Sequence, residues 1–100
     1  MHTTEITAEN FQREVMESQK PVLLDFYATW CGPCRAQSRI LDEMSGDWKL
    51  CKVNIDENLP LTSQYGISSV PTLVVIKSGN VVATHTGVCS KEKILTMLQS

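Results

Sequence analysis

The most informative part of the chain reads Val22-Leu23-Leu24-Asp25-Phe26-Tyr27-Ala28-Thr29-Trp30-Cys31-Gly32-Pro33-Cys34. Residues 22–27 are apolar except for Asp25, a pattern typical of a central strand that is covered on both faces. A helix is expected to begin at Cys31, because a proline such as Pro33 is tolerated in a first helical turn. A buried strand that leads directly into a helix indicates an α/β fold.

Strands and helices are expected to alternate on both sides of this unit. Apolar periodicity and turn residues predict strands over residues 3–6, 48–55, 70–76 and 81–85. The same signals predict helices over residues 8–18, 31–44 and 59–64, and a last helix that begins after Ser90. The order βαβαβαββα requires parallel crossovers in its first half, and the turn at residues 78–80 requires one antiparallel hairpin. We therefore predict a mixed sheet with helices on both faces.

Three of the helices are expected to bury one apolar face each against this sheet. Thr7 is the expected N-cap of the first helix. The side chains expected to face inward are Ala8, Phe11 and Val15 in the first helix, Ala36, Ile40, Leu41 and Met44 in the second, and Ile94, Leu95 and Leu98 in the last.

Length and charge limit the classes of protein to which the chain can belong. Its 100 residues are the size of one domain, which we expect to span residues 1–100. A net charge of −2 supplies no basic field, so we expect binding to neither nucleic acid nor an anionic membrane. No apolar run is long enough for a transmembrane helix. Residues 1–5 lack the features of a secretory signal, so a cytoplasmic location is expected.

The cysteines, at positions 31, 34, 51 and 89, are too few for a disulfide scaffold in a chain that can build its own core. A structural zinc site normally needs a second close pair of ligands, and Cys51 and Cys89 do not supply one. We therefore expect no metal and no other cofactor.

Cys31 and Cys34 are expected to undergo disulfide exchange. A helix N-terminus stabilises a thiolate, which is the nucleophile in that reaction. Cys31, at the start of the helix, should be the exposed thiol of lowered pKa, and Cys34, about one turn later, should be more buried. The alternative is a buried pair without a redox role, which leaves Trp30 beside the pair unexplained.

Asp25 is a carboxylate inside an apolar strand, where an unpaired charge costs free energy. Its pKa should therefore rise above the usual value. An acid at this place could exchange a proton with Cys34 through a water molecule. The alternative is a structural acid paired with Lys52, which lies in a neighbouring interior strand, and both roles can hold together.

Pro71 lies where a strand is expected to start, a position that tolerates proline. The residues alone favour an ordinary trans bond between Val70 and Pro71, because cis bonds before proline are uncommon. A cis bond would instead leave the backbone of Val70 free to pair with an extended segment of a substrate protein.

Several groups of residues occur in the order and spacing of a known family. They are residues 25–34, Lys52-Val53-Asn54-Ile55-Asp56, Tyr65-Gly66-Ile67-Ser68-Ser69-Val70-Pro71-Thr72-Leu73, Lys77-Ser78-Gly79 and Gly87. With them the chain resembles the thioredoxin family over nearly its whole length. The resemblance implies a thioredoxin fold, with a mixed central sheet of about five strands flanked by four helices on both faces.

The resemblance also implies an activity and the residues that carry it. The implied activity is protein-disulfide reduction by a monomeric electron carrier, which a flavin-dependent thioredoxin reductase re-reduces and which acts on disulfide-containing substrate proteins. Cys31 would be the nucleophile and Cys34 the resolving thiol, with Asp25 and Lys52 behind them. Pro71 would be cis. The implied hydrophobic contact surface consists of Trp30, Gly32, Pro33, Val70, Pro71, Gly87 and Val88.

Three features depart from the family pattern. Arg39 stands where relatives often have a proline that kinks the helix, so a straighter helix is expected here. Tyr27 stands where many relatives have a tryptophan. Cys51 and Cys89 are additional: Cys51 should point into the sheet as an inert hydrophobe, whereas Cys89 is either accessible near the contact surface and open to regulatory oxidation, or packed and silent.

Two other functions use the same residues. A disulfide oxidase or isomerase of an oxidising compartment is the nearest alternative, although Gly32-Pro33 between the cysteines and the missing signal argue against it. A non-catalytic binding subunit that uses the same hydrophobic surface is the other alternative.

Overall fold

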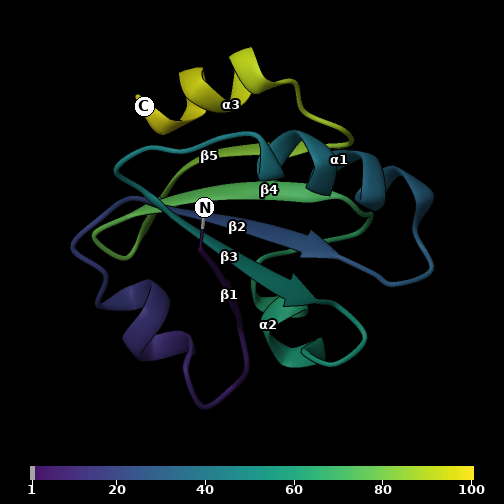
Figure 1. The fold of residues 1–100 in the computed structure, drawn as a ribbon. Helices are drawn as coiled ribbons and strands as arrows, with labels where there is room; N and C mark the ends of the chain where they lie inside the picture. Colours follow the sequence, from purple (N-terminus) through teal and green to yellow (C-terminus); the bar gives the residue numbers. More distant parts are fainter. Residues whose placement is uncertain (1) are drawn as a thin grey trace.

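A computed structural model describes residues 2–100 and shows a central sheet between two layers of helices (Figure 1). The five-stranded sheet has the order β1-β3-β2-β4-β5. Its strands are β1 (Thr3–Glu5), β2 (Val22–Tyr27), β3 (Lys49–Asn54), β4 (Thr72–Lys77) and β5 (Asn80–Thr86). The helical elements are η1 (Gln12–Met16), α1 (Gly32–Asp42), α2 (Leu59–Gln64) and α3 (Lys91–Leu98). The predicted order of elements and the mixed sheet are confirmed.

The direction of β4 places the start of that strand beside the end of β2. Strand β3 runs parallel to both β1 and β2, as predicted. Strand β4 is antiparallel to β5 and also to β2, with Phe26 paired to Thr72, and this second antiparallel pair was not anticipated. The segment that precedes Thr72 therefore lies near the segment that follows β2, where α1 begins.

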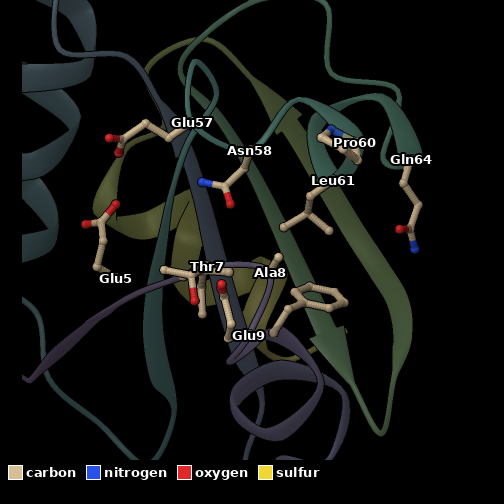
Figure 2. A pocket seen from close by; sticks show the side chains of 11 residues that line it. Glu5, Thr7, Ala8, Glu9, Glu57, Asn58, Pro60, Leu61 and Gln64 are labelled. Atoms are coloured by element: carbon tan, nitrogen blue, oxygen red, sulfur yellow. The ribbon is translucent and has the colours of Figure 1, made fainter.

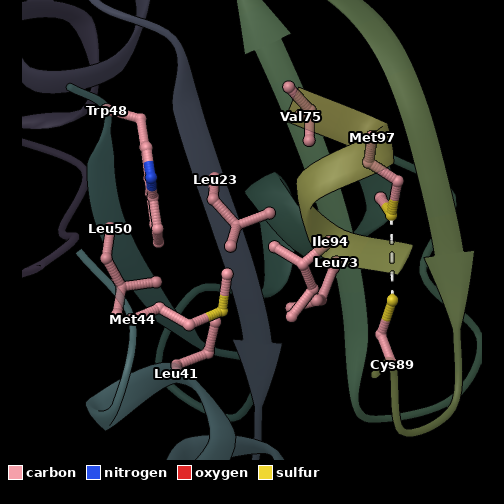
Figure 3. Packing of buried hydrophobic residues seen from close by; sticks show 10 residues of the cluster. All are labelled: Leu23, Leu41, Met44, Trp48, Leu50, Leu73, Val75, Cys89, Ile94 and Met97. Atoms are coloured by element: carbon pink, nitrogen blue, oxygen red, sulfur yellow. Dashed lines mark hydrogen bonds between the residues drawn. The ribbon is translucent and has the colours of Figure 1, made fainter. Parts of the chain in front are cut away.

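Alternation along the central strands divides the core into two clusters. On the face covered by α1 and α3, Leu23 packs with side chains of both helices, among them Leu41 and Ile94 (Figure 3). On the opposite face, Leu24 packs with side chains that include Val15 of η1. Because β2 is buried on both faces, its apolar run needs no alternation, as the sequence indicated.

The first helical element is shorter than predicted. The element η1 spans Gln12–Met16, and residues 8–10 before it form a turn. Thr7 is not an N-cap: its backbone N–H donates to Oδ1 of Asn10 at 2.8 Å. Ala8 is consequently exposed, whereas Val15 is buried as expected.

The buried faces of α1 and α3 also differ from the prediction. The buried side chains of α1 are Cys34, Gln37 and Leu41, while Ala36 and Ile40 are only partly buried. In α3, Met97 is buried with Ile94, and Leu95 is 40% exposed. The apolar periodicity missed Gln37 because a polar residue was assumed to face solvent.

One predicted helix boundary is confirmed and another is not. Ser90 caps α3, because its Oγ accepts a hydrogen bond from the N–H of Lys93 at 3.1 Å. Helix α1 continues through Arg39 and ends at Asp42, two residues before the predicted end at residue 44.

The turn between β4 and β5 places Ser78 and Gly79 at positive φ angles of 51° and 81°, as a tight hairpin requires.

Candidate active site

Cys31 and Cys34 form a disulfide at the N-terminus of α1. The chain leaves β2 at Tyr27 and turns, and the N–H of Cys31 donates to the carbonyl of Ala28. Cys31 is the N-cap residue of α1, and its Sγ accepts a hydrogen bond from the N–H of Cys34 at 3.1 Å. The unpaired N–H groups of a first helical turn stabilise negative charge, so this sulfur lies where a thiolate is favoured.

The expected difference in exposure between the two cysteines is absent from the disulfide form. Cys31 is 5% exposed and Cys34 is 4% exposed, so the expectation of an exposed Cys31 is wrong for this state. The physical reason is packing: both cysteines cluster with Ala28, and Val70 packs against the same cluster.

The segment before β4 lies against the disulfide. The bond between Val70 and Pro71 is cis, in agreement with the implication of the resemblance. The Sγ of Cys31 is 3.8 Å from the carbonyl oxygen of Val70. The N–H of Gly87, in the loop after β5, donates to the carbonyl of Pro71 at 2.8 Å. The segment that contains Val70 and Pro71 therefore contacts both the disulfide and the loop after β5.

Two exposed apolar side chains lie on these segments. Trp30 is 67% exposed, and its Nε1 donates to Oδ2 of Asp56 at 2.9 Å. Val88 is 44% exposed. Beside Trp30 there is a shallow pocket of about 360 Å³, lined by Trp30, Ile55, Ile67, Ser68, Ser69 and Val70. Pro71 is buried. The solvent-exposed part of the expected contact surface therefore consists mainly of residues around Pro71.

Asp25 is fully buried beneath α1 and lies opposite Lys52 in the sheet. The Nζ of Lys52 is 3.8 Å from Oδ2 of Asp25, and neither carboxylate oxygen accepts a hydrogen bond from any group in residues 2–100. Burial raises the pKa of Asp25 to about 6, against the lowering effect of the Lys52 charge, and the charge of Glu5 adds to the rise. The expectation of a perturbed buried acid is confirmed.

The ammonium group of Lys52 has two other neighbours. It donates to Oγ of Ser38 at 2.7 Å and lies 4.8 Å from the centre of the Tyr27 ring. An open pocket of about 250 Å³ is lined by Tyr27, Ala28, Thr29, Cys34, Arg35, Ser38 and Lys52. Because this pocket opens to solvent, water can lie between Cys34 and Lys52.

Sequence reasoning missed three residues around the site. Asp56 holds Trp30, Ser38 holds Lys52, and Gln37 hydrogen-bonds to the backbone of Cys89. Ser38 follows Cys34 by one helical turn, so the spacing of the two residues was a usable signal. Asp56 and Gln37 reach partners far away in sequence, which no local pattern reports.

Cys51 and Cys89 are both buried free cysteines. Cys51 points into the core, and burial raises its pKa to about 11, which agrees with an inert hydrophobe. Cys89 is 1% exposed, its Sγ lies 3.8 Å from Sδ of Met97 (Figure 3), and burial raises its pKa. Of the two alternatives for Cys89, the structure supports the packed and silent residue.

A larger pocket of about 520 Å³ lies on the opposite side of the sheet from α1, between the chain near Thr7 and helix α2 (Figure 2). Its walls combine apolar side chains such as Phe11 and Leu61 with the carboxylates of Glu5 and Glu57. It includes none of the expected catalytic or contact residues.

Comparison with known proteins places this arrangement in a family. The family model for thioredoxin matches residues 2–100. The chain is 40% identical to thioredoxin from Pseudomonas aeruginosa, over 99% of this chain and 95% of that protein. It is 45% identical to thioredoxin from Rickettsia felis, over 90% of both chains, and 44% identical to thioredoxin 1 from Synechococcus elongatus, over 93% of this chain and 91% of that protein.

The chain belongs to the thioredoxin family. Its fold is the thioredoxin fold, and its function is that of a thioredoxin: an oxidoreductase that reduces disulfides by dithiol–disulfide exchange. Thioredoxins act on disulfide substrates and are generally reduced by a thioredoxin reductase. None of the helices in residues 2–100 is long and apolar enough to cross a membrane.

Proposed function

We propose that Cys31 is the attacking thiol when this thioredoxin reduces a protein disulfide. The observation that carries the proposal is the position of its sulfur, at the N-cap of α1 and within hydrogen-bond distance of the N–H of Cys34. The Cys31 thiolate attacks one sulfur of the substrate disulfide, forms a mixed disulfide with it, and releases the other substrate sulfur as a thiolate.

Cys34 then completes the transfer of two electrons. Its thiolate attacks the Cys31 sulfur, which forms the disulfide between Cys31 and Cys34 and releases the second substrate thiolate. Before this step the Cys34 thiol must lose a proton. Asp25 is the acceptor that we propose, because its pKa of about 6 suits proton exchange near neutral pH. Lys52, which lines an open pocket together with Cys34, places its charge 3.8 Å from that carboxylate.

The substrate would lie across the apolar surface around the disulfide. We assign this contact surface to Trp30, Gly32, Pro33, Val70, Pro71, Gly87 and Val88. Trp30, next to Cys31, and Val88, in the loop that Gly87 joins to Pro71, both supply exposed apolar side chains. An extended substrate segment could pair with the backbone at Val70, whose carbonyl faces the Cys31 sulfur.

The proposed reaction cycle requires a reductant for the disulfide form. We propose that a thioredoxin reductase supplies the electrons, and that the chain works as a monomer of one domain in the cytoplasm. Neither a metal nor a bound cofactor enters this cycle, because both half-reactions are thiol–disulfide exchanges.

Insulin reduction tests the proposed function. The protein, NADPH and a bacterial thioredoxin reductase are expected to reduce insulin disulfides, with oxidation of NADPH as the readout. Cys31→Ser should abolish turnover, whereas Cys51→Ser, a buried control away from the disulfide, should retain it. Full turnover in Cys31→Ser would refute the proposal.

Asp25→Asn should slow turnover by about tenfold or more at neutral pH, because a proton acceptor is lost.

A further inference from the structure

Gln37 is a fully buried polar side chain in the helix that carries the disulfide. It follows Cys34 by three residues on α1 and shares its buried face. An amide buried without hydrogen bonds is costly, so a glutamine at this place requires specific partners.

Both polar groups of the Gln37 side chain bind the backbone of one residue. Its Oε1 accepts from the N–H of Cys89 at 2.7 Å, and its Nε2 donates to the carbonyl of Cys89 at 3.1 Å. Cys89 lies between β5 and α3, outside both elements. The Gln37 amide therefore satisfies both the N–H and the carbonyl of Cys89, as the backbone of a neighbouring strand would.

This loop is fastened on both sides of an exposed contact residue. Before Val88, the N–H of Gly87 donates to the carbonyl of Pro71. After Val88, Gln37 holds Cys89, whose side chain packs against Met97 in the core (Figure 3). Val88 thus projects between two anchors, one beside the cis proline and the other on α1.

We propose that Gln37 is a positioning residue for protein substrates, which fixes the Gly87–Cys89 loop relative to the helix that begins at Cys31. The proposal rests on the proposed function, because Val88 acts there as a contact residue. A protein disulfide must contact the loop and Cys31 together, so its reaction depends on their relative placement. A small disulfide touches only the sulfur and its immediate surroundings, so its reaction does not depend on the loop.

Single-turnover kinetics separate this role from a general contribution to folding. Pre-reduced protein is mixed with insulin or with DTNB, a small aromatic disulfide, so that no reductase is needed. Gln37→Met keeps the length of the side chain and removes both hydrogen bonds. We expect its rate with insulin to fall by about tenfold, in line with the cost of misplacing a reacting group, while its rate with DTNB stays within about twofold of wild type.

Two further variants complete the experiment. Leu24→Ala weakens the core on the opposite face of the sheet, and we expect it to keep the wild-type ratio of the two rates even where its urea midpoint falls as far as that of Gln37→Met. Gln37→Glu keeps an acceptor for the Cys89 N–H, so its ratio should lie between those of Gln37→Met and wild type. Gln37→Leu, which also removes both hydrogen bonds, serves if Gln37→Met does not fold.

The outcomes distinguish this proposal from the proposed function. An unchanged ratio in the folded Gln37 variants, or an equal loss with both substrates, would overturn the positioning role while the wild-type protein still reduced insulin. Failure of the wild-type protein to reduce insulin would instead overturn the proposed function. Faster hydrogen exchange at the Cys89 amide in Gln37→Met is the expected sign that the anchor has been lost.

Discussion

Asp25 bears on the stability of the protein and on the proton transfer that we propose. Its carboxylate is fully buried, accepts no hydrogen bond from residues 2–100, and has Lys52 at 3.8 Å rather than in direct contact. Such a group is costly when charged, and burial raises its pKa to about 6. A buried carboxylate that is retained despite this cost in stability is typical of a functional site.

Asp25→Asn should make the oxidised protein more stable at neutral pH. The pKa of Asp25 is 3.8 when unperturbed and about 6 in the folded protein, so the folded state holds the proton more tightly. The free energy of unfolding should therefore fall by about 2 kcal/mol as pH rises from about 4 to about 6. In Asp25→Asn this part of the pH dependence should disappear.

Urea unfolding at several pH values between 4 and 7 checks this prediction, with the exposed Asp42→Asn as the control. The difference in the free energy of unfolding between wild type and Asp25→Asn isolates Asp25 from other carboxylates. Glu14 is one of these, and its hydrogen bond with Lys49 lowers its pKa. A difference that does not change with pH would show that the carboxyl of Asp25 has an ordinary pKa.

Lys52→Met should raise the pKa of Asp25 above about 6. The Lys52 charge is the nearest influence that lowers this pKa, so its removal leaves burial and the charge of Glu5 unopposed. Carbon-13 NMR titration of the Asp25 carboxyl measures the change. Lys77→Met is the control, because Nζ of Lys77 binds the carbonyl of Ser100 instead. A pKa that stays at its wild-type value or falls would contradict the electrostatic role of Lys52.

At the scale of elements, the N-terminus of α1 distinguishes the two cysteines that burial leaves equivalent. Cys31 caps the helix and accepts a hydrogen bond from the N–H of Cys34, whereas Cys34 lies inside the first turn. The field and the free N–H groups of the helix therefore act most directly on the Cys31 sulfur.

Cys31 should consequently be the first thiol that iodoacetamide alkylates in the reduced protein. Thiolates react and thiols do not, so the sulfur at the helix N-cap should lead. Mass spectrometry of briefly treated protein gives the order. Cys51 and Cys89, both buried, should stay unmodified under native conditions and serve as internal controls. Faster labelling of Cys34 would reverse the assigned roles.

A capping side chain also stabilises the N-terminus of α3. Oγ of Ser90 binds the N–H of Lys93, and the helix that it starts packs Ile94 and Met97 on the core. Ser90→Ala should lower the free energy of unfolding by about 1 kcal/mol in urea titrations. Ser45→Ala, in the exposed loop after α1, is the matched control and should change it little. Equal stability of wild type and Ser90→Ala would mean that the cap adds nothing.

Local patterns predicted most elements because the strands are short apolar runs between turn residues. The bounds of β2 and α2 match the prediction, and Ser90 was recognised as a cap. The patterns failed where tertiary contacts decide. Gln37 is buried because a distant loop supplies both its partners, and Leu95 is exposed because Met97 takes the inward position.

At the scale of the whole molecule, sheet topology assembles the site. Strand β4 is antiparallel to β2, so the cis bond before Pro71 comes beside the disulfide that follows β2. The loop after β5 joins them through Gly87, and Asp25 and Lys52 meet because β2 and β3 are parallel neighbours. The sequence indicated these residues one by one, and their assembly followed from the resemblance to a family rather than from local physics.

Trapping a mixed disulfide tests the central claim, that Cys31 attacks the substrate and Cys34 resolves the intermediate. Reduced Cys34→Ser is incubated with insulin, quenched with acid and analysed by mass spectrometry, with Cys31→Ser in parallel. We predict a covalent complex of Cys34→Ser with insulin, linked through Cys31, and none with Cys31→Ser. A complex that forms through Cys34 in Cys31→Ser, with none in Cys34→Ser, would contradict the account.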